Sequence, residues 1–258
     1  MNLAAVVLAA GDGIRLQPLT LLRPKPLCPV GGRPLLEWAL DNVEAVAGRG
    51  RVSVAVNVHQ HAAGLRAWIG SRATVSHEEP EALGTAGALA LLQPWLDGRD
   101  VLVHNGDAYL PGGLELLAGG WDGKRCRLLC LPVDGPADFD GLRYVGACLL
   151  PWSLVSGLRP EPTGLYEVLW RDLLRAGELD FAVLPPDAVA IDCGTPARYL
   201  AANLHASGGA SVIGAGARVL GRLEHSVVWD GGYVGPEEVL VRTIRAGDEA
   251  DPVTVPAG

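Results

Sequence analysis

The chain has 258 residues, 49% of them apolar and 19% charged, a composition typical of a globular protein with one sizeable core. Its formal net charge of −8 at pH 7 argues against non-specific binding to nucleic acids or to anionic membrane surfaces, although a local cationic pocket is compatible with phosphate ligands. No stretch reaches the roughly 18 apolar residues of a membrane-spanning helix, and no basic segment of the kind that begins a signal peptide precedes the first apolar run. We therefore expect a cytoplasmic protein without nucleic-acid or membrane partners.

Cysteine usage indicates the same compartment. The cysteines are odd in number, scattered along the chain, and form no C-x-x-C pair: Cys28, Cys126, Cys130, Cys148 and Cys193. Such usage is typical of reduced, mostly buried thiols in a cytosolic protein.

The first predicted element is a buried strand over the apolar run Leu3 to Leu8, which ends at a loop with two glycines, Gly11 and Gly13. Glycines let the backbone approach a ligand closely, and consecutive N–H groups in such a turn form an anion site. Arg15 follows, and Lys25 lies ten residues further on between two prolines. The pattern predicts a phosphate cradle with two fixed cations; the alternative is an ordinary glycine- and proline-rich surface loop.

Two common phosphate-binding motifs do not fit this loop. A dinucleotide fingerprint requires a third glycine where Leu16 stands, and a P-loop requires a Gly-Lys-Ser/Thr tripeptide that does not follow this strand. The segment also holds prolines that keep it extended or turning: Pro18, Pro24, Pro26 and Pro29. We therefore expect a long, open loop that wraps its ligand.

Strands and helices then alternate regularly. We expect strands over Arg51–Val58, Ala73–Ser76 and Val101–His104, and helices over Pro34–Ala47, Ala62–Ile69 and Gly84–Leu92. Thr85 is a candidate N-cap of the third helix. This alternation predicts a mostly parallel sheet with helices on both faces. Right-handed crossovers place the loops that follow the strands at one edge, where such sheets bind ligands.

The second half is less regular, and its texture changes from Ser211 onward. We expect strands over Arg127–Val133, Tyr144–Leu150, Phe181–Leu184 and Ala188–Cys193, and helices over Tyr166–Ala176 and Thr195–Ala206. From Ser211, short valine-rich segments recur at roughly six- to eight-residue intervals, a pattern typical of stacked β-helix coils; the alternative is a glycine-rich tail with hairpins. We predict an α/β domain over residues 1–207 and a short β-helix tail over residues 208–258 that packs on the main domain or on another subunit.

Two acids lie at the ends of predicted strands and are expected at the same sheet edge: Asp107 in Asn105-Gly106-Asp107, and Asp192 in Ile191-Asp192-Cys193. Carboxylates that face a triphosphate are a common way to hold Mg²⁺, which takes one or two of them with phosphate oxygens and water. The alternatives are a turn residue and a cap for the following helix. His59 and His61 lack a third zinc ligand and are assigned to an exposed loop.

The run from Leu8 to Trp38, LAAGDGIRLQPLTLLRPKPLCPVGGRPLLEW, resembles the signature of sugar-1-phosphate nucleotidylyltransferases. These enzymes join a nucleoside triphosphate and a sugar 1-phosphate into a nucleotide sugar and pyrophosphate. Further matching blocks lie at Leu83–Leu89, Asn105–Asp107 and Asp192–Pro196, and the tail is similar to the left-handed β-helix extension of the mannose-1-phosphate guanylyltransferase branch. The resemblance implies a Rossmann-like α/β fold followed by a short left-handed β-helix.

The resemblance also implies roles for individual residues. Nucleotide contacts would come from the glycine loop around the triphosphate and from a second block near the base and ribose: Leu8, Ala10, Gly11 and Gly13, then Gly84 and Thr85. Arg15 would contact the leaving pyrophosphate, Lys25 the phosphates at the reacting centre, and Asp107 and Asp192 would hold Mg²⁺. The sugar phosphate attacks the α-phosphorus in line, so catalysis rests on positioning and charge stabilisation, with Arg15, Lys25 and Asp107 as the catalytic residues.

One family feature is missing from the sequence. Many members carry a central Glu-Lys-Pro segment whose lysine binds the sugar phosphate, and this chain has no such tripeptide. The corresponding region is Asp138–Gly146, where Arg143 is the only cation and our candidate substitute, because a guanidinium binds phosphate through two hydrogen bonds. Gly146 and Glu167 are the other candidate sugar contacts, and the alternative for Glu167 is a charge that stabilises a helix N-terminus.

The resemblance favours a Mg²⁺-dependent enzyme that uses GTP and mannose 1-phosphate, with a UTP- or dTTP-dependent enzyme as the alternative. Two other hypotheses are a non-catalytic regulatory subunit that binds nucleotide sugar and an enzyme that acts on choline phosphate or another alcohol phosphate. The expected partners are the two substrates, and the tail is a candidate contact within a homo-oligomer.

Overall fold

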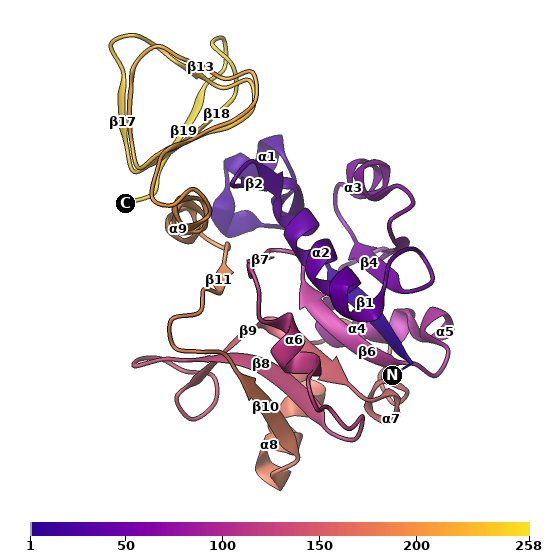
Figure 1. Ribbon diagram of the computed structural model, residues 1–258. Coiled ribbons are helices and arrows are strands. Elements are labelled where there is room, and N and C mark those ends of the chain that lie inside the picture. Colours follow the sequence, from indigo (N-terminus) through magenta and orange to yellow (C-terminus); the bar gives the residue numbers. More distant parts are fainter. Residues whose placement is uncertain (1) are drawn as a thin grey trace. The chain divides into compact units, whose positions relative to one another are not determined.

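The computed structural model describes residues 2–258, which form two compact units (Figure 1). The first unit comprises residues 2–11 and 38–190, and the second comprises residues 12–37 and 191–258. Helix α2 (Leu35–Ala47) carries the chain from the second unit back into the first. The predicted domain boundary after residue 207 concerns a different division of the chain and stays a prediction. Within residues 2–258, no helix has the length and apolar character needed to cross a membrane.

A seven-stranded sheet forms the centre of the first unit, in the order β10-β8-β9-β6-β1-β4-β5. In chain order its strands are β1 (Leu3–Leu8), β4 (Val54–Val58), β5 (Thr74–His77), β6 (Asp100–Asn105), β8 (Cys126–Pro132), β9 (Leu142–Leu150) and β10 (Leu179–Val183). Four neighbouring pairs are parallel, and the two antiparallel pairs both involve β9. The predicted mostly parallel sheet is therefore confirmed, with β9 as its exception.

Helices lie on both faces of this sheet, as predicted. Val103 of β6 belongs to the same buried apolar cluster as Leu89 of helix α4 (Gly84–Leu91). The next residue along β6, His104, is hydrogen-bonded instead to Asn42 of α2, with 3.4 Å between His104 Nε2 and Asn42 Nδ2. Because successive side chains of a strand point to opposite faces, α4 and α2 cover opposite sides of the sheet.

The remaining elements of the first unit are short. They are α3 (Ala62–Ile69), α5 (Gln93–Leu96), β7 (Ala108–Tyr109), α6 (Leu114–Ala118), α7 (Trp152–Val155) and α8 (Arg171–Ala176). The helix expected over 166–176 begins as a π-helical turn, Tyr166–Trp170, that leads into α8. The sequence did not indicate α5, β7, α6 or α7, because segments this short carry little periodicity. All five cysteines are free and buried, as expected.

The second unit contains the glycine- and proline-rich segment, which we call the cationic loop (residues 12–34). It consists of the 3₁₀ turn η1 (Ile14–Leu16), helix α1 (Leu19–Leu22), the 3₁₀ turn η2 (Lys25–Leu27), and the antiparallel strands β2 (Pro29–Val30) and β3 (Arg33–Pro34). The segment is long, as expected, but it is not the open loop that the sequence predicts, and the wrapping of a ligand stays a prediction. Internal hydrogen bonds fold the segment on itself; the hydroxyl of Thr20, for example, donates to the carbonyl of Gly13 over 3.0 Å.

Helix α9 (Pro196–Ala206) begins one residue after the expected start at Thr195. Pro196 occupies its first turn, and the N-cap is Thr195, whose Oγ1 accepts from the Arg198 amide over 3.4 Å. A proline at this position has no N–H to leave unpaired, and a threonine satisfies one of the free amides of the first turn. The strand before it, β11 (Ile191–Asp192), is shorter than the expected strand over 188–193.

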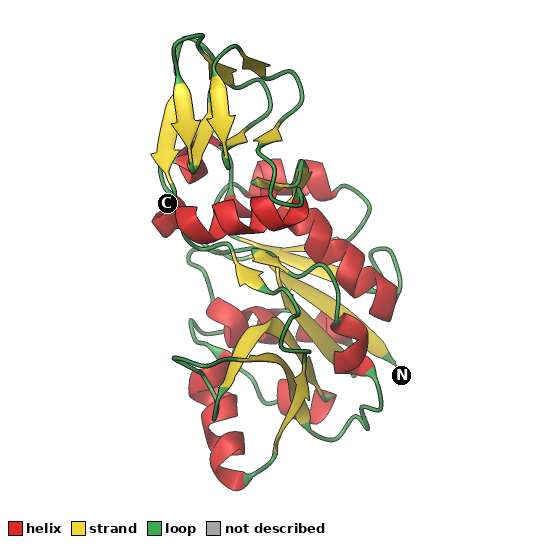
Figure 2. Cartoon of the chain, turned by 60° about the vertical axis from the view of Figure 1, so that its left-hand side comes forward, coloured by secondary structure: helices red, strands yellow, loops and turns green. Residues whose placement is uncertain are grey.

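After α9 the chain forms parallel ladders of short strands (Figure 2). In the first ladder, β15 (Val227–Val228) lies between β12 (Val212–Ile213) and β18 (Thr243–Ala246) and is parallel to both. In the other two ladders, β13 (Arg218–Val219) pairs with β16 (Tyr233–Val234), and β14 (Arg222–Glu224) pairs with β17 (Val239–Val241). The last strand, β19 (Val253–Pro256), is antiparallel to β18. Val212 pairs with Val227 and Arg218 with Tyr233, fifteen positions further on in each case. The expected stacking of short repeated segments is present, and a left-handed β-helix stays a prediction.

Candidate functional site

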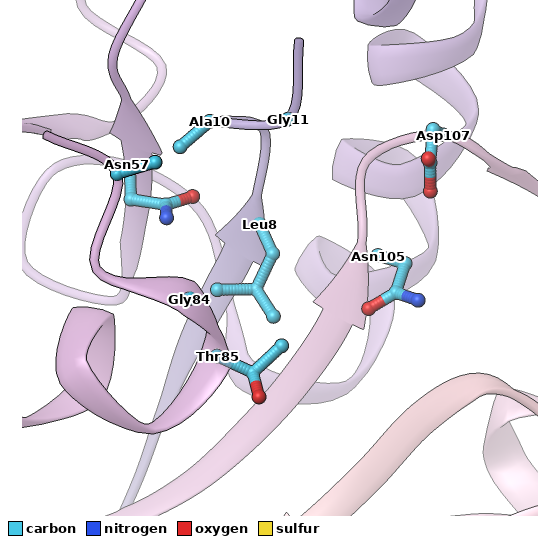
Figure 3. Close-up of a pocket in the computed structure, with 9 residues that line it drawn as sticks. Leu8, Ala10, Gly11, Asn57, Gly84, Thr85, Asn105 and Asp107 are labelled. Atoms are coloured by element: carbon cyan, nitrogen blue, oxygen red, sulfur yellow. The ribbon is translucent and has the colours of Figure 1, made fainter. Parts of the chain in front are cut away.

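Three parallel strands of the first unit end in one row. In the register of the sheet, Leu8 at the end of β1 pairs with Asn57 of β4 on one side and with Asn105 of β6 on the other. Figure 3 shows Leu8 between these two asparagines. A pocket of about 240 Å³ lies at this row and is lined by Leu8, Ala10, Gly11, Asn57, Ala82, Gly84, Thr85, Asn105 and Asp107. Six predicted site residues therefore line one pocket at the carboxyl edge of the sheet, as expected for such a sheet.

Asn57 fixes one wall of the pocket and was not selected from the sequence. Its Oδ1 accepts from the amide of Ala9 and its Nδ2 donates to Oε1 of Glu78, both over 2.7 Å. Glu78 is fully buried, and its other oxygen accepts from the amide of Leu83 over 2.7 Å. This chain of bonds connects the start of the glycine loop to the entry of α4. The signal in the sequence is a single polar side chain near the end of an otherwise apolar strand.

The entry of α4 forms the second wall. Gly84 has φ = +68°, and a Cβ there would lie 2.6 Å from the carbonyl oxygen of Thr163, so only glycine fits. The predicted N-cap role of Thr85 is wrong. Its hydroxyl oxygen accepts from the amide of Leu165 over 2.8 Å and so connects α4 to a segment eighty positions away. Both residues thereby hold the helix entry close against the segment around 163–165.

The turn Asn105-Gly106-Asp107 brings an acid to the pocket. The Gly106 amide donates to the carbonyl of Leu8 over 2.8 Å, and a Cβ at this glycine would lie 2.9 Å from the same oxygen. The close approach keeps the turn against β1, so Asp107 lines the pocket opposite Ala10 and Asn57 (Figure 3). Gly146, a predicted sugar contact, lies beside this turn, because a Cβ on it would be 3.1 Å from Nδ2 of Asn105.

His104 also holds the turn Asn105-Gly106-Asp107 in place. Nδ1 of His104 donates to the carbonyl of Asn105 over 2.8 Å. Nε2 of His104 lies 3.4 Å from Nδ2 of Asn42, which also donates to the carbonyl of Leu110 over 2.8 Å. The ring is fully buried, and this desolvation lowers the pKa of His104 to about 4. The imidazole is therefore neutral at pH 7.

A depressed histidine pKa makes stability depend on pH in a definite direction. His104 contributes fully above its unfolded pKa of roughly 6.5, and its contribution falls as pH drops towards the folded value of about 4. Between pH 7.5 and 4 we expect the wild type to lose about 3 kcal/mol more unfolding free energy than His104→Gln, which cannot titrate. Urea denaturation of both proteins at the two pH values measures this. Equal losses would show that His104 does not protonate in this way.

The second unit places one acid among three cations. Asp192, at the end of β11, has carboxylate oxygens 3.5 Å from Lys25 Nζ, 3.8 Å from Arg15 Nη2 and 3.4 Å from Arg198 Nη1. Arg15 is exposed, whereas Lys25 is only 7% exposed. The structure thus brings together the two predicted phosphate-binding cations and a predicted metal ligand. Arg198, in the first turn of α9, was not predicted.

All three predicted sugar contacts, Arg143, Gly146 and Glu167, lie outside the pocket lining. Arg143 is part of the β8–β9 pairing, opposite Leu131. Glu167 is exposed in the π-helical turn, beside Gly164. Their roles, like those of the other site residues, stay predictions. Nδ1 of His59 lies 2.9 Å from the carbonyl oxygen of Glu78, which gives this histidine a structural contact at the end of β4.

The strands that form the pocket lie within a recognisable family region. Residues 4–118 match the family model described as Nucleotidyl transferase. Over these residues the chain is similar to the nucleotidyl transferase family. This region contains the whole lining of the pocket as well as Arg15 and Lys25 of the cationic loop.

Several curated proteins that carry the names of sugar-1-phosphate nucleotidylyltransferases are similar to parts of this chain. N-acetylmuramate alpha-1-phosphate uridylyltransferase of Neisseria meningitidis serogroup B is 37% identical over 109 residues, 40% of this chain and 46% of that protein. The protein of the same name from Caulobacter vibrioides is 33% identical over 158 residues, 57% and 64% of the two chains. The probable mannose-1-phosphate guanylyltransferase 2 of Arabidopsis thaliana is 26% identical over 232 residues, 76% and 63% of the two. The chain thus spans between 46% and 64% of the length of these relatives.

These names confirm the predicted resemblance to sugar-1-phosphate nucleotidylyltransferases. A solved structure named mannose-1-phosphate geranyltransferase, from Thermus thermophilus, matches with a TM-score of 0.70 over 100% of this chain and 96% of that one, at 18% identity. At this identity the likeness concerns the fold alone. It supports the predicted Rossmann-like arrangement of a mostly parallel sheet with helices.

Proposed function

We propose that this nucleotidyl transferase chain joins a nucleoside triphosphate to a sugar 1-phosphate and releases pyrophosphate. The observation that carries the proposal is the pocket at the row Leu8–Asn57–Asn105, whose lining includes Gly11, Gly84 and Asp107. Backbone at Gly11 and Gly84 suits close approach to a nucleotide, and the Asp107 carboxylate suits a metal ion that neutralises phosphate charge. The family match over the same residues supports this assignment.

The cationic loop would supply charge stabilisation. In nucleotidyl transfer the sugar phosphate attacks the α-phosphorus and pyrophosphate leaves, so the protein gains mainly by positioning and by neutralising phosphate charge. Lys25 and Arg15 suit this role because both cations already lie within 4 Å of one anion, the Asp192 carboxylate. We propose that phosphate oxygens take over these contacts when substrate binds.

A metal ion is also part of the proposal. Among residues 2–258 no three His, Cys, Asp or Glu side chains gather as a metal site, so an ion here would be held by one or two carboxylates and by phosphate oxygens. This is the coordination that Mg²⁺ accepts, and the carboxylate oxygens of Asp107 in the first unit and of Asp192 in the second are each a ligand type that suits it. When bound, the ion would neutralise charge on the phosphates.

The sequence resemblance favours GTP with mannose 1-phosphate. A second pair, UTP with N-acetylmuramate 1-phosphate, is favoured by the two uridylyltransferases that are 37% and 33% identical to this chain over 109 and 158 residues. The tail also favours GTP with mannose 1-phosphate, because its parallel ladders support the left-handed β-helix implied by the guanylyltransferase resemblance.

A pyrophosphate-release assay tests the proposed function. The purified chain is incubated with Mg²⁺, each of GTP, UTP, dTTP and ATP, and each of mannose 1-phosphate, glucose 1-phosphate, N-acetylmuramate 1-phosphate and choline phosphate. We expect release that requires both substrates and is strongest with GTP or UTP and a sugar phosphate. Turnover with choline phosphate alone would favour an alcohol-phosphate enzyme. Nucleotide-sugar binding without turnover of any pair would favour a regulatory subunit and contradict the proposal.

A further inference from the structure

The tail meets the cationic loop at what we call the tail corner (Trp229 and Asp230). Arg23 lies two residues before Lys25, and its guanidinium carbon is 5.1 Å from the centroid of the Trp229 ring. Its Nη1 is 3.6 Å from Oδ2 of Asp230. A cation over an indole ring and an ion pair on the same guanidinium hold this side chain from two directions.

The tail corner is itself fixed by the neighbouring coils. Oδ1 of Asp230 accepts from the amide of Ala215 over 2.9 Å, and the Trp229 amide donates to the carbonyl of Arg245 over 2.8 Å. The Trp229 side chain is buried. Arg23 is therefore held by groups whose own positions are determined by the stacked strands of the tail.

A second connection reaches the loop on the other side of Lys25. The indole N–H of Trp229 donates to the hydroxyl oxygen of Tyr199 in α9 over 3.0 Å, and this hydroxyl donates to the carbonyl of Pro29. Both aromatic side chains are buried, with their rings edge to face. Pro29 lies four residues after Lys25, so contacts that start at the tail corner hold the loop both before and after this lysine.

Between these two connections the backbone makes one tight turn. The amide of Cys28 donates to the carbonyl of Lys25 over 3.0 Å, and the Cys28 thiol lies 3.7 Å from the carbonyl oxygen of Arg23 and 3.8 Å from that of Pro24. Lys25 begins this turn and extends its ammonium group towards Asp192. The direction of the lysine thus depends on a backbone segment held at both ends.

We propose that Trp229 and Asp230 are positioning residues, through which the tail holds the cationic loop in the conformation that presents Lys25 to phosphate. The effect on turnover rests on the proposed function, whereas the effect on loop order does not. The tail then contributes to the site from within one chain, in addition to any contact between subunits.

The order of the loop is measured through Cys28. The Cys28 side chain is fully buried, and this burial raises the pKa of its thiol to about 12, so alkylation at neutral pH requires the loop to open and expose it. We expect Asp230→Asn and Trp229→Phe each to raise the Cys28 alkylation rate about tenfold, which corresponds to roughly 1.4 kcal/mol of lost loop stability. Asparagine can still accept from the Ala215 amide, whereas phenylalanine keeps an aromatic ring at this position but is smaller and lacks the indole N–H. Peptide mass spectrometry resolves each cysteine.

Two internal comparisons separate positioning from general destabilisation. Glu249→Gln removes another ion pair of the tail, with Arg218, whose 3.6 Å length equals that of the Arg23–Asp230 pair, and it should leave Cys28 labelling unchanged. Cys126, buried in the first unit, should keep its wild-type rate in every variant. Unchanged Cys28 labelling in both variants of the tail corner would overturn the proposal, as would an equal rise at Cys126.

Turnover provides the second readout. With the substrate pair found by pyrophosphate release, we expect kcat/KM to fall about tenfold in Asp230→Asn and Trp229→Phe, again the equivalent of roughly 1.4 kcal/mol, and to stay at the wild-type value in Glu249→Gln. Wild-type kcat/KM in a variant whose Cys28 labelling has risen would contradict the link to Lys25. If no substrate pair is turned over, the proposed function fails, and the labelling still decides whether the tail orders the loop.

Discussion

Replacing Lys25 with methionine is expected to lower kcat/KM for nucleotidyl transfer by about 10²- to 10³-fold, the loss typical when one group that stabilises transition-state charge is removed. Lys25 is buried along its stem, and its ammonium group lies 3.5 Å from the Asp192 carboxylate. Methionine keeps a long apolar stem, so the packing of the turn should survive while the charge is lost. Steady-state kinetics with the best substrate pair measure the effect, and thermal unfolding checks the fold.

The sequence offers a matched control for this substitution. Its only other lysine, Lys124, is exposed in the segment between α6 and β8. Lys124→Met makes the same chemical change away from the site and should keep wild-type rates. Lys25→Arg retains a positive charge and should lose less activity than Lys25→Met. Wild-type kinetics in Lys25→Met would remove this lysine from the mechanism.

Replacing Asp107 with asparagine is expected to lower kcat by about 10²- to 10³-fold while nucleotide binding weakens less, since the carboxylate acts where phosphate charge must be neutralised. Asp107 lines the pocket in a turn whose backbone is fixed by the Gly106–Leu8 hydrogen bond. Asparagine has nearly the same shape, so the turn should keep its conformation. Kinetics and calorimetric titration of the nucleotide measure the two effects.

Asp122 supplies the comparison for Asp107. It is an exposed acid of the same unit, and its Oδ1 accepts from the Lys124 amide over 2.9 Å, a contact that asparagine preserves. Asp122→Asn should therefore behave as the wild type. If Asp107→Asn also turns over at the wild-type rate, Asp107 takes no part in the reaction, and a chain that binds nucleotide sugar without catalysis becomes the better description.

The parts of the site that could be predicted from the sequence are those encoded by neighbouring residues. Short local patterns indicate where strands end. They are the apolar run of β1 with the glycines that follow it, and the turn Asn105-Gly106-Asp107. Parallel strands then bring such ends to one edge, which is why Leu8, Gly11 and Asp107 line one pocket. The start of α9 was predictable for the same reason, because Thr195 and Pro196 are adjacent.

The parts that could not be predicted depend on partners far away in the chain. Asn57 is hydrogen-bonded to Ala9 and Glu78, and Thr85 is hydrogen-bonded to Leu165. The residues next to Asn57 and Thr85 in the sequence do not indicate these partners. Arg198 is only six positions from Asp192, and it contacts this acid because the chain turns between β11 and the first turn of α9. The antiparallel direction of β9 was missed because an apolar run has the same composition in either direction.

The identity of the product tests the central claim most directly. The chain is incubated with Mg²⁺, a nucleoside triphosphate labelled at its α-phosphorus, and a sugar 1-phosphate. The products are then separated and identified by mass spectrometry. We predict that the label appears in a nucleotide sugar, formed together with an equal amount of pyrophosphate, and that this product is reduced in Lys25→Met and Asp107→Asn. Label found only in nucleoside monophosphate or diphosphate, or left in the triphosphate with every sugar phosphate, would contradict nucleotidyl transfer by this site.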